Sequence, residues 1–454
     1  MTRIRVGVVG ALAACAVWRA AAAGFTGPAE WRTVHTNAVA AWQAAQAHAV
    51  PAGDVWRGVV ADRQRREVRL LAEAVGHRVG ITAEFLLVGP LSDRAYEAVA
   101  VTIALPGDIV RAVECLGLAR GGCVGSRPFR FWPCGERVEV TVRRLDVSDA
   151  PTRPLQVLID DKETAAPLVG EGGLVFTGAR WEGATCRADT NMPSSVIALY
   201  NAPDTVFDVP FQVGQSEVYG RLSLAEALPY GAPLEIVLRP LLPADGRPRV
   251  LPLTVSAAWD GGRVTLTCAH ADGRAATEGE MAEVLSWLRA QAGSGREPYV
   301  TVRFDDAMPL RRAADVARVF DMLDGKGIKL DGKADDGLYP KAFLPLEKWR
   351  ERKDRHPQPF ELHVTRAADG ALSKKLVFIE EDWTVEGLDP KLTPRDYPFT
   401  EWAELPKLVT QTGGADSKVR LLFVYAPADL PLNTFMPGVR AVADRLGLVY
   451  VFGE

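Results

Sequence analysis

The sequence predicts an α/β protein, α+β overall, in which a mainly β N-terminal domain is followed by one or two βαβ units. The chain has 454 residues, and because domains seldom grow beyond roughly 250 residues, more than one core is expected. Residues 137–142 alternate with the period of two that is typical of a strand. Residues 299–304 have the pattern of a strand, and a helix with one apolar stripe follows them.

Composition narrows the class of protein and of partner. Apolar residues make up 48% of the chain and charged residues 24%, which is average for globular proteins and argues against wholesale disorder or a multi-span membrane protein. The net charge is -4 and the isoelectric point is about 6.0, so the chain as a whole does not attract nucleic acid or anionic lipid. Nucleic acid is therefore not an expected partner.

The first 24 residues have the pattern of a signal peptide. Arg3 and Arg5 precede an apolar run over residues 6–18, and small residues follow at 20–24. The run is too short to cross a bilayer comfortably, because a spanning helix needs about 20 apolar residues. We therefore expect export to the periplasm or cell envelope, with no transmembrane domain after cleavage.

Two ways of processing this segment stay open, besides an uncleaved anchor or no export at all. Ordinary cleavage is favoured, because residues 21–23 are Ala-Ala-Ala and match a small-residue cleavage site. The alternative is lipidation at Cys15, since residues 12–15, Leu-Ala-Ala-Cys, resemble a bacterial lipobox. Lipidation would leave the protein anchored to the membrane by a lipid.

Five cysteines lie beyond this segment, and three of them are crowded into a glycine-rich stretch. Cys115, Cys123 and Cys134 are the candidates for a disulfide, because an exported protein meets an oxidising compartment. Spacing alone does not give the pairing. The alternative is buried free thiols, which behave as small apolar side chains. A zinc site is not expected, since no Cys-x-x-Cys or His-x-x-x-His spacing accompanies these residues.

The N-terminal part of the chain divides into two segments after the signal peptide. Residues 25–53 form an alanine-rich lead-in that ends at Pro-Ala-Gly. Residues 54–245 carry short β-type runs separated by turn residues, together with one helix, as a mainly β domain requires. A stretch with several prolines and a glycine, residues 240–252, marks the next boundary.

Several short sequence motifs within residues 54–245 occur in the same order as in a known domain. These motifs are Phe85-Leu86-Leu87-Val88, a helix ending in Cys115-Leu116-Gly117, Leu174-Val175-Phe176-Thr177-Gly178, Ala188-Asp189 and Ile197-Ala198-Leu199-Tyr200-Asn201. In this order they resemble a YdjY-like domain. The resemblance implies a fold neighbourhood and an envelope setting but no reaction, and residues 121–135 depart from the family pattern.

The next segment, residues 253–335, alternates strand and helix patterns. The expected elements are strands at 264–268, 299–304 and 328–330, and helices at 278–288 and from Leu310. With this order and an acidic turn before the second helix, residues 257–332 resemble an ExbD/TolR-like periplasmic domain. Membrane-anchored members of that family carry a proton-binding aspartate on a transmembrane helix. No segment upstream supplies that helix, so the resemblance does not imply a motor role.

The C-terminal segment, residues 336–454, ends in a second βαβ pattern. A strand at 421–425, a helix and a strand at 448–452 repeat the earlier arrangement, and both helices begin at Pro-Leu, at Pro309 and at Pro431. We expect the two units to share one topology. We also expect them to lie in one sheet or in two closely packed sheets, because each helix must bury its apolar stripe.

Residues 339–360 mix aromatic side chains, prolines and a local excess of basic residues. One interpretation is an arm that binds an anion or a partner protein, with Trp349 as a stacking surface and Arg350, Arg352 and Arg355 as fork-shaped donors. The alternative, which we favour, is a short charged helix that packs on the βαβ units and pairs its arginines with glutamates at helical spacing.

No motif for catalysis or cofactor binding stands out. We find no His-Glu-x-x-His, no Gly-x-Ser-x-Gly, no dinucleotide fingerprint between a strand and a helix, and no P-loop. We therefore assign no catalytic residue, cofactor or metal ligand. The sequence predicts an exported envelope binding or assembly protein without catalytic activity, in which an envelope protein or a second copy pairs at a sheet edge. The alternative is an envelope hydrolase with a site that the motifs do not reveal.

Overall fold

A computed structural model describes residues 56–125, 131–163, 166–167, 172–243, 245–330, 360–382, 391–413, 421–446 and 448–453. These residues fall into two compact units: the first runs up to Val124 and continues over Trp132–Arg249, and the second takes Gly125–Phe131 and the chain from Val250 on. The structure confirms the predicted mixed α+β architecture, and the first unit is mainly β. No helix among the described residues is long and apolar enough to span a bilayer.

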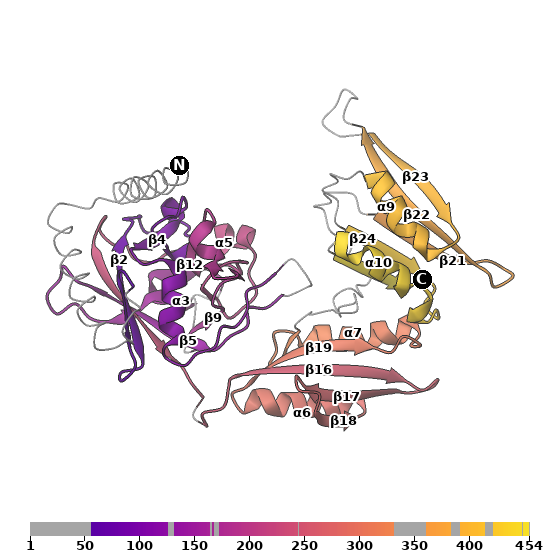
Figure 1. Ribbon diagram of the computed structural model, residues 1–454, viewed down its shortest axis with the longest axis horizontal. Helices are drawn as coiled ribbons and strands as arrows, with labels where there is room; N and C mark the ends of the chain where they lie inside the picture. The colour runs from indigo at the N-terminus through magenta and orange to yellow at the C-terminus, as the bar shows by residue number, and fades with distance from the viewer. Residues whose placement is uncertain are drawn as a thin grey trace, which may run out of the picture. The chain divides into compact units, whose positions relative to one another are not determined.

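The first unit is built around a closed barrel of eight strands, seen in indigo to magenta in Figure 1. Around the barrel the strands are β2 (Glu67–Ala74), β15 (Pro233–Pro240), β5 (Arg137–Arg144), β9 (Leu174–Phe176), β13 (Phe207–Asp208), β12 (Ser195–Ala198), β3 (Phe85–Val88) and β4 (Ala98–Thr102). Pairing of β4 with β2 closes the ring. Closure pairs strands that would otherwise be open edges.

Side chains fill the barrel. Along β5, Val138, Val140 and Val142 face the core and are at most 3% exposed, because successive residues of a strand point to opposite sides. Helix α3 (Pro106–Glu114) packs an apolar face that includes Ile109 and Val113 into the same core. The interior of this barrel is therefore a packed core.

Shorter elements complete the first unit. They are β1 (Val59–Asp62), β6 (Arg153–Pro154), β7 (Ile159–Asp161), β8 (Ala166–Pro167), β10 (Trp181–Glu182), β11 (Thr185–Cys186), β14 (Leu222–Leu224), α4 (Arg187–Thr190), α5 (Gln215–Arg221), and the 3-10 helices η1 (Ala95–Glu97) and η2 (Leu155–Leu158). Strand β7 pairs with β14 and β8 in a small sheet. Arg221 at the end of α5 donates to both carboxylate oxygens of Asp161 in β7, at 3.0 and 2.7 Å. This pair connects α5 to the small sheet.

The second unit contains two five-stranded sheets, one in each half of the unit. The elements of the first half are β16 (Val250–Trp259), β17 (Val264–His270), β18 (Ala275–Gly279), α6 (Met281–Gly293), β19 (Glu297–Phe304), α7 (Leu310–Leu323) and β20 (Lys329–Leu330). Its strands lie in the order β18, β17, β16, β19, β20. The first three are antiparallel, whereas β19 runs parallel to both β16 and β20.

The second half has the same topology. Its elements are β21 (Phe360–Arg366), β22 (Leu372–Asp382), β23 (Lys391–Phe399), η4 (Trp402–Glu404), α9 (Leu405–Gly413), β24 (Leu421–Ala426), η5 (Leu432–Thr434), α10 (Met436–Leu446) and β25 (Leu448–Gly453). The strand order is β23, β22, β21, β24, β25, with β24 parallel to both β21 and β25. Each strand thus occupies the same place as its counterpart in the first half.

The halves also match in sequence at two points. Glu-Met-Ala-Glu at 280–283 corresponds to Glu-Trp-Ala-Glu at 401–404, and in both the first glutamate's N–H donates to the carboxylate of the second, at 2.9 Å in the first half and 2.7 Å in the second. Pro309 before α7 corresponds to Pro431 before η5 and α10, a shift of 431 − 309 = 122 positions. Leucine follows each of these prolines and is buried in both halves. The halves are two versions of one fold.

The two prolines meet, and the contact between the halves is reciprocal. Pro309 and Pro431 form an isolated antiparallel bridge. Beside it, the Leu310 N–H donates to the Leu430 carbonyl at 2.9 Å, and the Leu432 N–H donates to the Met308 carbonyl at 3.0 Å. The shift of 122 positions exchanges one of these bonds for the other. Such self-complementarity is the property of an interface with two-fold symmetry.

The strands around α7 and α10 belong to two sheets rather than to one shared sheet. The reason is that each half supplies three antiparallel strands of its own, most of which the sequence patterns did not reveal. Strand β16, for example, begins inside the stretch 240–252 that was expected to be a boundary. The buried side chains of the two halves nevertheless form one continuous apolar cluster.

Candidate functional site

Several predicted sites lie outside the described residues. These are Cys15 with the rest of the signal peptide, the lead-in 25–53, and the aromatic and basic segment with Trp349, Arg350, Arg352 and Arg355. Lipidation at Cys15 and partner binding by that segment therefore stay predictions.

No disulfide joins Cys115, Cys123 and Cys134 in the structure, and the disulfide among them stays a prediction. Cys115 follows α3 directly. Cys123 instead points its Sγ toward the Thr205 carbonyl at 3.4 Å, and burial raises the pKa of this thiol to about 12. A thiol with so high a pKa is a weak nucleophile and metal ligand. Among the described residues, no three His, Cys, Asp or Glu side chains form a group that could hold a metal ion.

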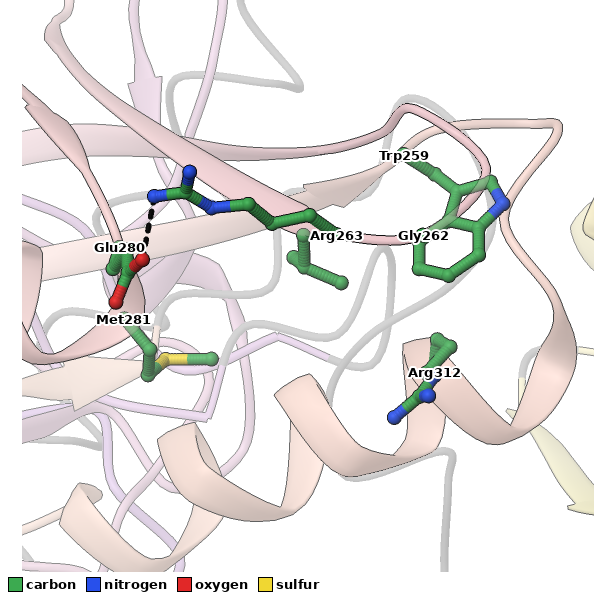
Figure 2. Close-up of a pocket in the computed structure, with 7 residues that line it drawn as sticks. Trp259, Gly262, Arg263, Glu280, Met281 and Arg312 are labelled. Carbon is green, nitrogen blue, oxygen red and sulfur yellow. Dashed lines mark hydrogen bonds and ion pairs between the residues drawn. The ribbon is translucent and has the colours of Figure 1, made fainter.

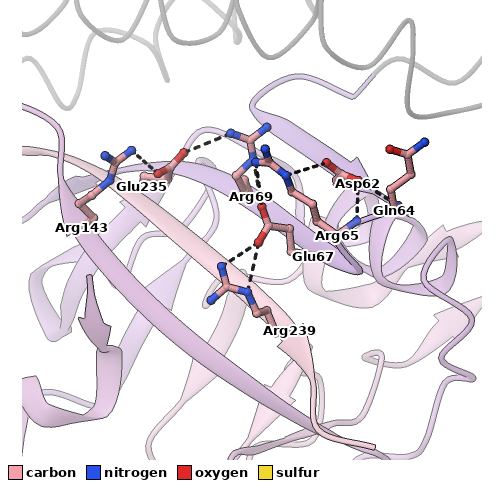
Figure 3. A network of polar contacts seen from close by, with 8 residues as sticks. All are labelled: Asp62, Gln64, Arg65, Glu67, Arg69, Arg143, Glu235 and Arg239. Atoms are coloured by element: carbon pink, nitrogen blue, oxygen red, sulfur yellow. Dashed lines mark hydrogen bonds and ion pairs between the residues drawn. The ribbon is translucent and has the colours of Figure 1, made fainter. Parts of the chain in front are cut away.

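A network of charged side chains covers one outer side of the barrel (Figure 3). Glu67 on β2 and Glu235 on β15 are only 5% and 7% exposed. Arg239 donates to Glu67 at 2.7 Å and Arg143 donates to Glu235 at 2.6 Å, while Arg69 lies within 4 Å of both carboxylates. Because arginines surround these carboxylates, the network links adjacent strands and presents no reactive group.

Polar side chains also gather where β3 and β4 begin. Glu84 is 2% exposed and accepts hydrogen bonds from the Tyr219 hydroxyl and from the Gln215 amide, the latter at 2.9 Å. Arg94 donates to Glu97 beside them at 3.2 Å. The hydrogen bond to Glu84 raises the pKa of Tyr219 far above its usual value, so this hydroxyl stays protonated. The cluster holds α5 on the barrel and supplies no activated nucleophile.

Asp208 on β13 is a fully buried carboxyl group. Its Oδ1 accepts hydrogen bonds from the Asn201 amide at 3.1 Å and the Val209 N–H at 2.7 Å, whereas its Oδ2 has no hydrogen-bond partner within the described residues. Burial raises the pKa of this carboxyl well above its ordinary value, against the effect of these bonds. Because no part of Asp208 reaches solvent, we assign it no role in binding.

An open pocket of about 400 Å³ lies in the first half of the second unit (Figure 2). Trp259, the last residue of β16, and Arg312 in the first turn of α7 face each other across it, with the Arg312 Cζ 5.9 Å from the centre of the Trp259 ring. Met281 at the start of α6 lines it as well. The pocket thus lies where β16 ends and both helices begin, which is where α/β sheets commonly bind ligands.

Sequence reasoning did not single out this pocket. Trp259 ends a strand just before an Asp-Gly-Gly turn, a position that indicates a hairpin and not a ligand. Met281 and Arg312 come from two separate helices further along the chain. Only the sheet order, with β17 and β18 on one side of β16 and β19 on the other, brings the three together.

Each five-stranded sheet has one edge strand that is antiparallel to its neighbour, and these two edge strands differ in how readily a further strand could pair with them. Strand β18 ends the first sheet and is paired on one side, by β17, while β23 ends the second and is paired by β22. Strand β23 carries Pro394 and Pro398, which lack the N–H that a further strand would need. Strand β18, Ala-Ala-Thr-Glu-Gly, has no proline and no lysine.

Comparison with known proteins leaves the family open. No family model matches the chain, and no curated protein matches it. Among solved structures, the chain is matched with a foamy viral protease-reverse transcriptase in complex with an RNA/DNA hybrid, at 8% identity and a TM-score of 0.13. The match covers 44% of this chain and 36% of that one. A likeness this low supports no conclusion about function or about nucleic acid.

Proposed function

We propose that the chain is an exported protein of the cell envelope that binds or assembles with other proteins, without a reaction of its own. A partner strand pairs with β18 at the open end of the first sheet. The partner is an envelope protein or a second copy of this chain.

The observation that carries this proposal is the contrast between β18 and its counterpart β23. The two strands hold the same place in matching sheets, so their different chemistry does not follow from the fold. Prolines are a common means of blocking an edge strand, and β23 has two of them. An edge without proline or lysine keeps its backbone donors and acceptors available for a further strand.

Two further features are consistent with the proposal but would not be sufficient for it alone. The unit already joins its halves by reciprocal backbone hydrogen bonds at Pro309 and Pro431, so pairing through the main chain is a device that this fold uses. The N-terminal pattern with Arg3 and Arg5, and the resemblance to YdjY-like and ExbD/TolR-like domains, favour an envelope setting. No feature of the described residues favours the alternative of an envelope hydrolase.

A photo-crosslinking amino acid in place of Thr277 in β18 is expected to capture the partner strand in cells. The matched control carries the same group in place of Thr393, which is exposed on β23. We expect an adduct from position 277 and none from position 393, because the prolines of β23 exclude a further strand. Gel mass would separate a dimer of the chain from an adduct with another protein. The absence of an adduct at 277, or equal adducts from both positions, would contradict the proposal.

A further inference from the structure

The pocket beside Trp259 combines an apolar surface with an arginine, Arg312, whose ion pair with Asp315 is long and exposed. The Trp259 ring, Met281 and Val264 supply the apolar part of its lining. Arg312 is 44% exposed, and its nearest carboxylate, Asp315, lies 3.9 Å away, which is too far for a hydrogen bond. Within the described residues, its guanidinium therefore makes no hydrogen bond. Its Cζ lies 5.9 Å from the centre of the Trp259 ring, and Figure 2 shows both side chains.

The remaining charges of the pocket cancel each other. Arg263 donates to Glu280 at 2.5 Å, so this pair has no net charge. Arg312 is the remaining charged residue of the lining, and its own ion pair with Asp315 is long and exposed. A monoanion balances it, and a carboxylate matches the two-pronged geometry of a guanidinium.

The second half of the unit shows which of these residues the fold itself does not require. The position of Met281 is taken by Trp402. The Trp402 ring packs closely on Gly438, and a Cβ added to Gly438 would lie only 2.1 Å from this ring. The position of Arg312 is taken by Thr434, since 312 + 122 = 434. The same fold thus forms with a bulky ring in place of Met281 and without the cation.

The place of Trp259 itself is also filled differently in the second half. Trp259 and Arg366 are each the last paired residue before the turn of their hairpin, opposite Val264 and Leu372. Arg366 donates to Asp429 at 2.8 Å, so the cation there is already paired. Within the described residues, a half-buried tryptophan beside an arginine that makes only a long ion pair is therefore particular to the first half.

We propose that this pocket binds a monoanionic ligand whose carboxylate is attached to a flat or ring-shaped body. Arg312 holds the carboxylate, and the face of the Trp259 ring covers the body of the ligand, as aromatic side chains cover rings in other binding sites. A volume of about 400 Å³ accommodates one such ring with its carboxylate. This site does not depend on strand pairing at β18, so either proposal can fail without the other.

Calorimetric titration of the purified chain with glucuronate, benzoate and glucose tests the assignment. We expect at least one carboxylate to bind and glucose not to bind, because glucose lacks the charge. Binding of glucuronate alone would assign a sugar ring to the ligand, and binding of benzoate alone an aromatic one. If neither carboxylate binds better than glucose, the proposal is overturned.

Variants taken from the second half connect binding to the pocket. Arg312→Thr is expected to weaken binding at least about tenfold, with Arg312→Lys between it and the parent, because a charge-assisted forked contact is lost. Met281→Trp is expected to abolish binding by filling the pocket. Arg318→Thr is the matched control, because Arg318 also lies near Asp315, at 3.8 Å, but does not line the pocket. Circular dichroism melting would verify that each variant is folded. Binding that survives both Arg312→Thr and Met281→Trp would overturn the proposal.

Discussion

Replacing Val424 with proline is expected to destabilise the second unit by about 3 kcal/mol or more. Val424 is fully buried in β24, where it pairs with Leu362 on one side and Val451 on the other. Proline has no N–H for the ladder, and its ring clashes with the paired backbone of a central strand. Urea unfolding followed by circular dichroism would measure the loss.

The matched control is Asp396→Pro in the edge strand β23. Asp396 lies midway between Pro394 and Pro398, and residues two apart in a strand direct their N–H groups to the same side. Prolines occur in an edge strand at positions whose N–H would face away from the paired strand, so the Asp396 N–H is expected to face outward as well. Losing an N–H that makes no ladder bond should lower the free energy of unfolding by less than about 1 kcal/mol. If the two prolines destabilise the chain equally, β24 is not a central strand.

Replacing Arg221 with methionine is expected to destabilise the first unit by about 3 to 5 kcal/mol. The Asp161 side chain is only 2% exposed, and the guanidinium of Arg221 contacts both of its oxygens. Removing the cation leaves a buried carboxylate without its charge partner, which costs more than the pair itself contributes. The same unfolding measurement applies.

Two further variants separate this effect from a general loss of arginine. Combining Arg221→Met with Asp161→Asn removes the buried charge and should recover part of the stability. Arg187→Met breaks an exposed ion pair with Glu182, in which the Arg187 side chain is 44% exposed and the Glu182 side chain 70% exposed. This variant should change the free energy of unfolding by less than about 1 kcal/mol. A cost for Arg221→Met no larger than for Arg187→Met would show that the Asp161 pair is not buried in solution.

Those parts of the fold with a strong local pattern could be predicted from the sequence. The alternating run at 137–142 lies within β5, and the apolar stripe from Leu310 lies on α7. The shared Pro-Leu at Pro309 and Pro431 indicated related units, and these prolines proved to be the point where the two halves meet. Each of these signals is contained within about 20 residues, where periodicity is informative.

Other parts could not be predicted, because their patterns conflict with propensity or extend over distant segments. Strand β23 contains two prolines, which argue against a strand until it is known to be an edge. Strand β13 of the barrel is two residues long, too short for any periodicity. The pocket needs Trp259, Met281 and Arg312 from three elements, and the contact of Cys123 with the Thr205 carbonyl joins residues 82 positions apart.

We propose that the protein works outside the cytoplasm, and N-terminal analysis of the chain from fractionated cells tests this proposal. We expect a shortened chain in the periplasmic or envelope fraction. It would begin after the alanines at 21–23 if cleavage is ordinary, or at an acylated Cys15 if the protein is a lipoprotein. A chain in the cytosol that begins at Met1 or Thr2 would rule out export.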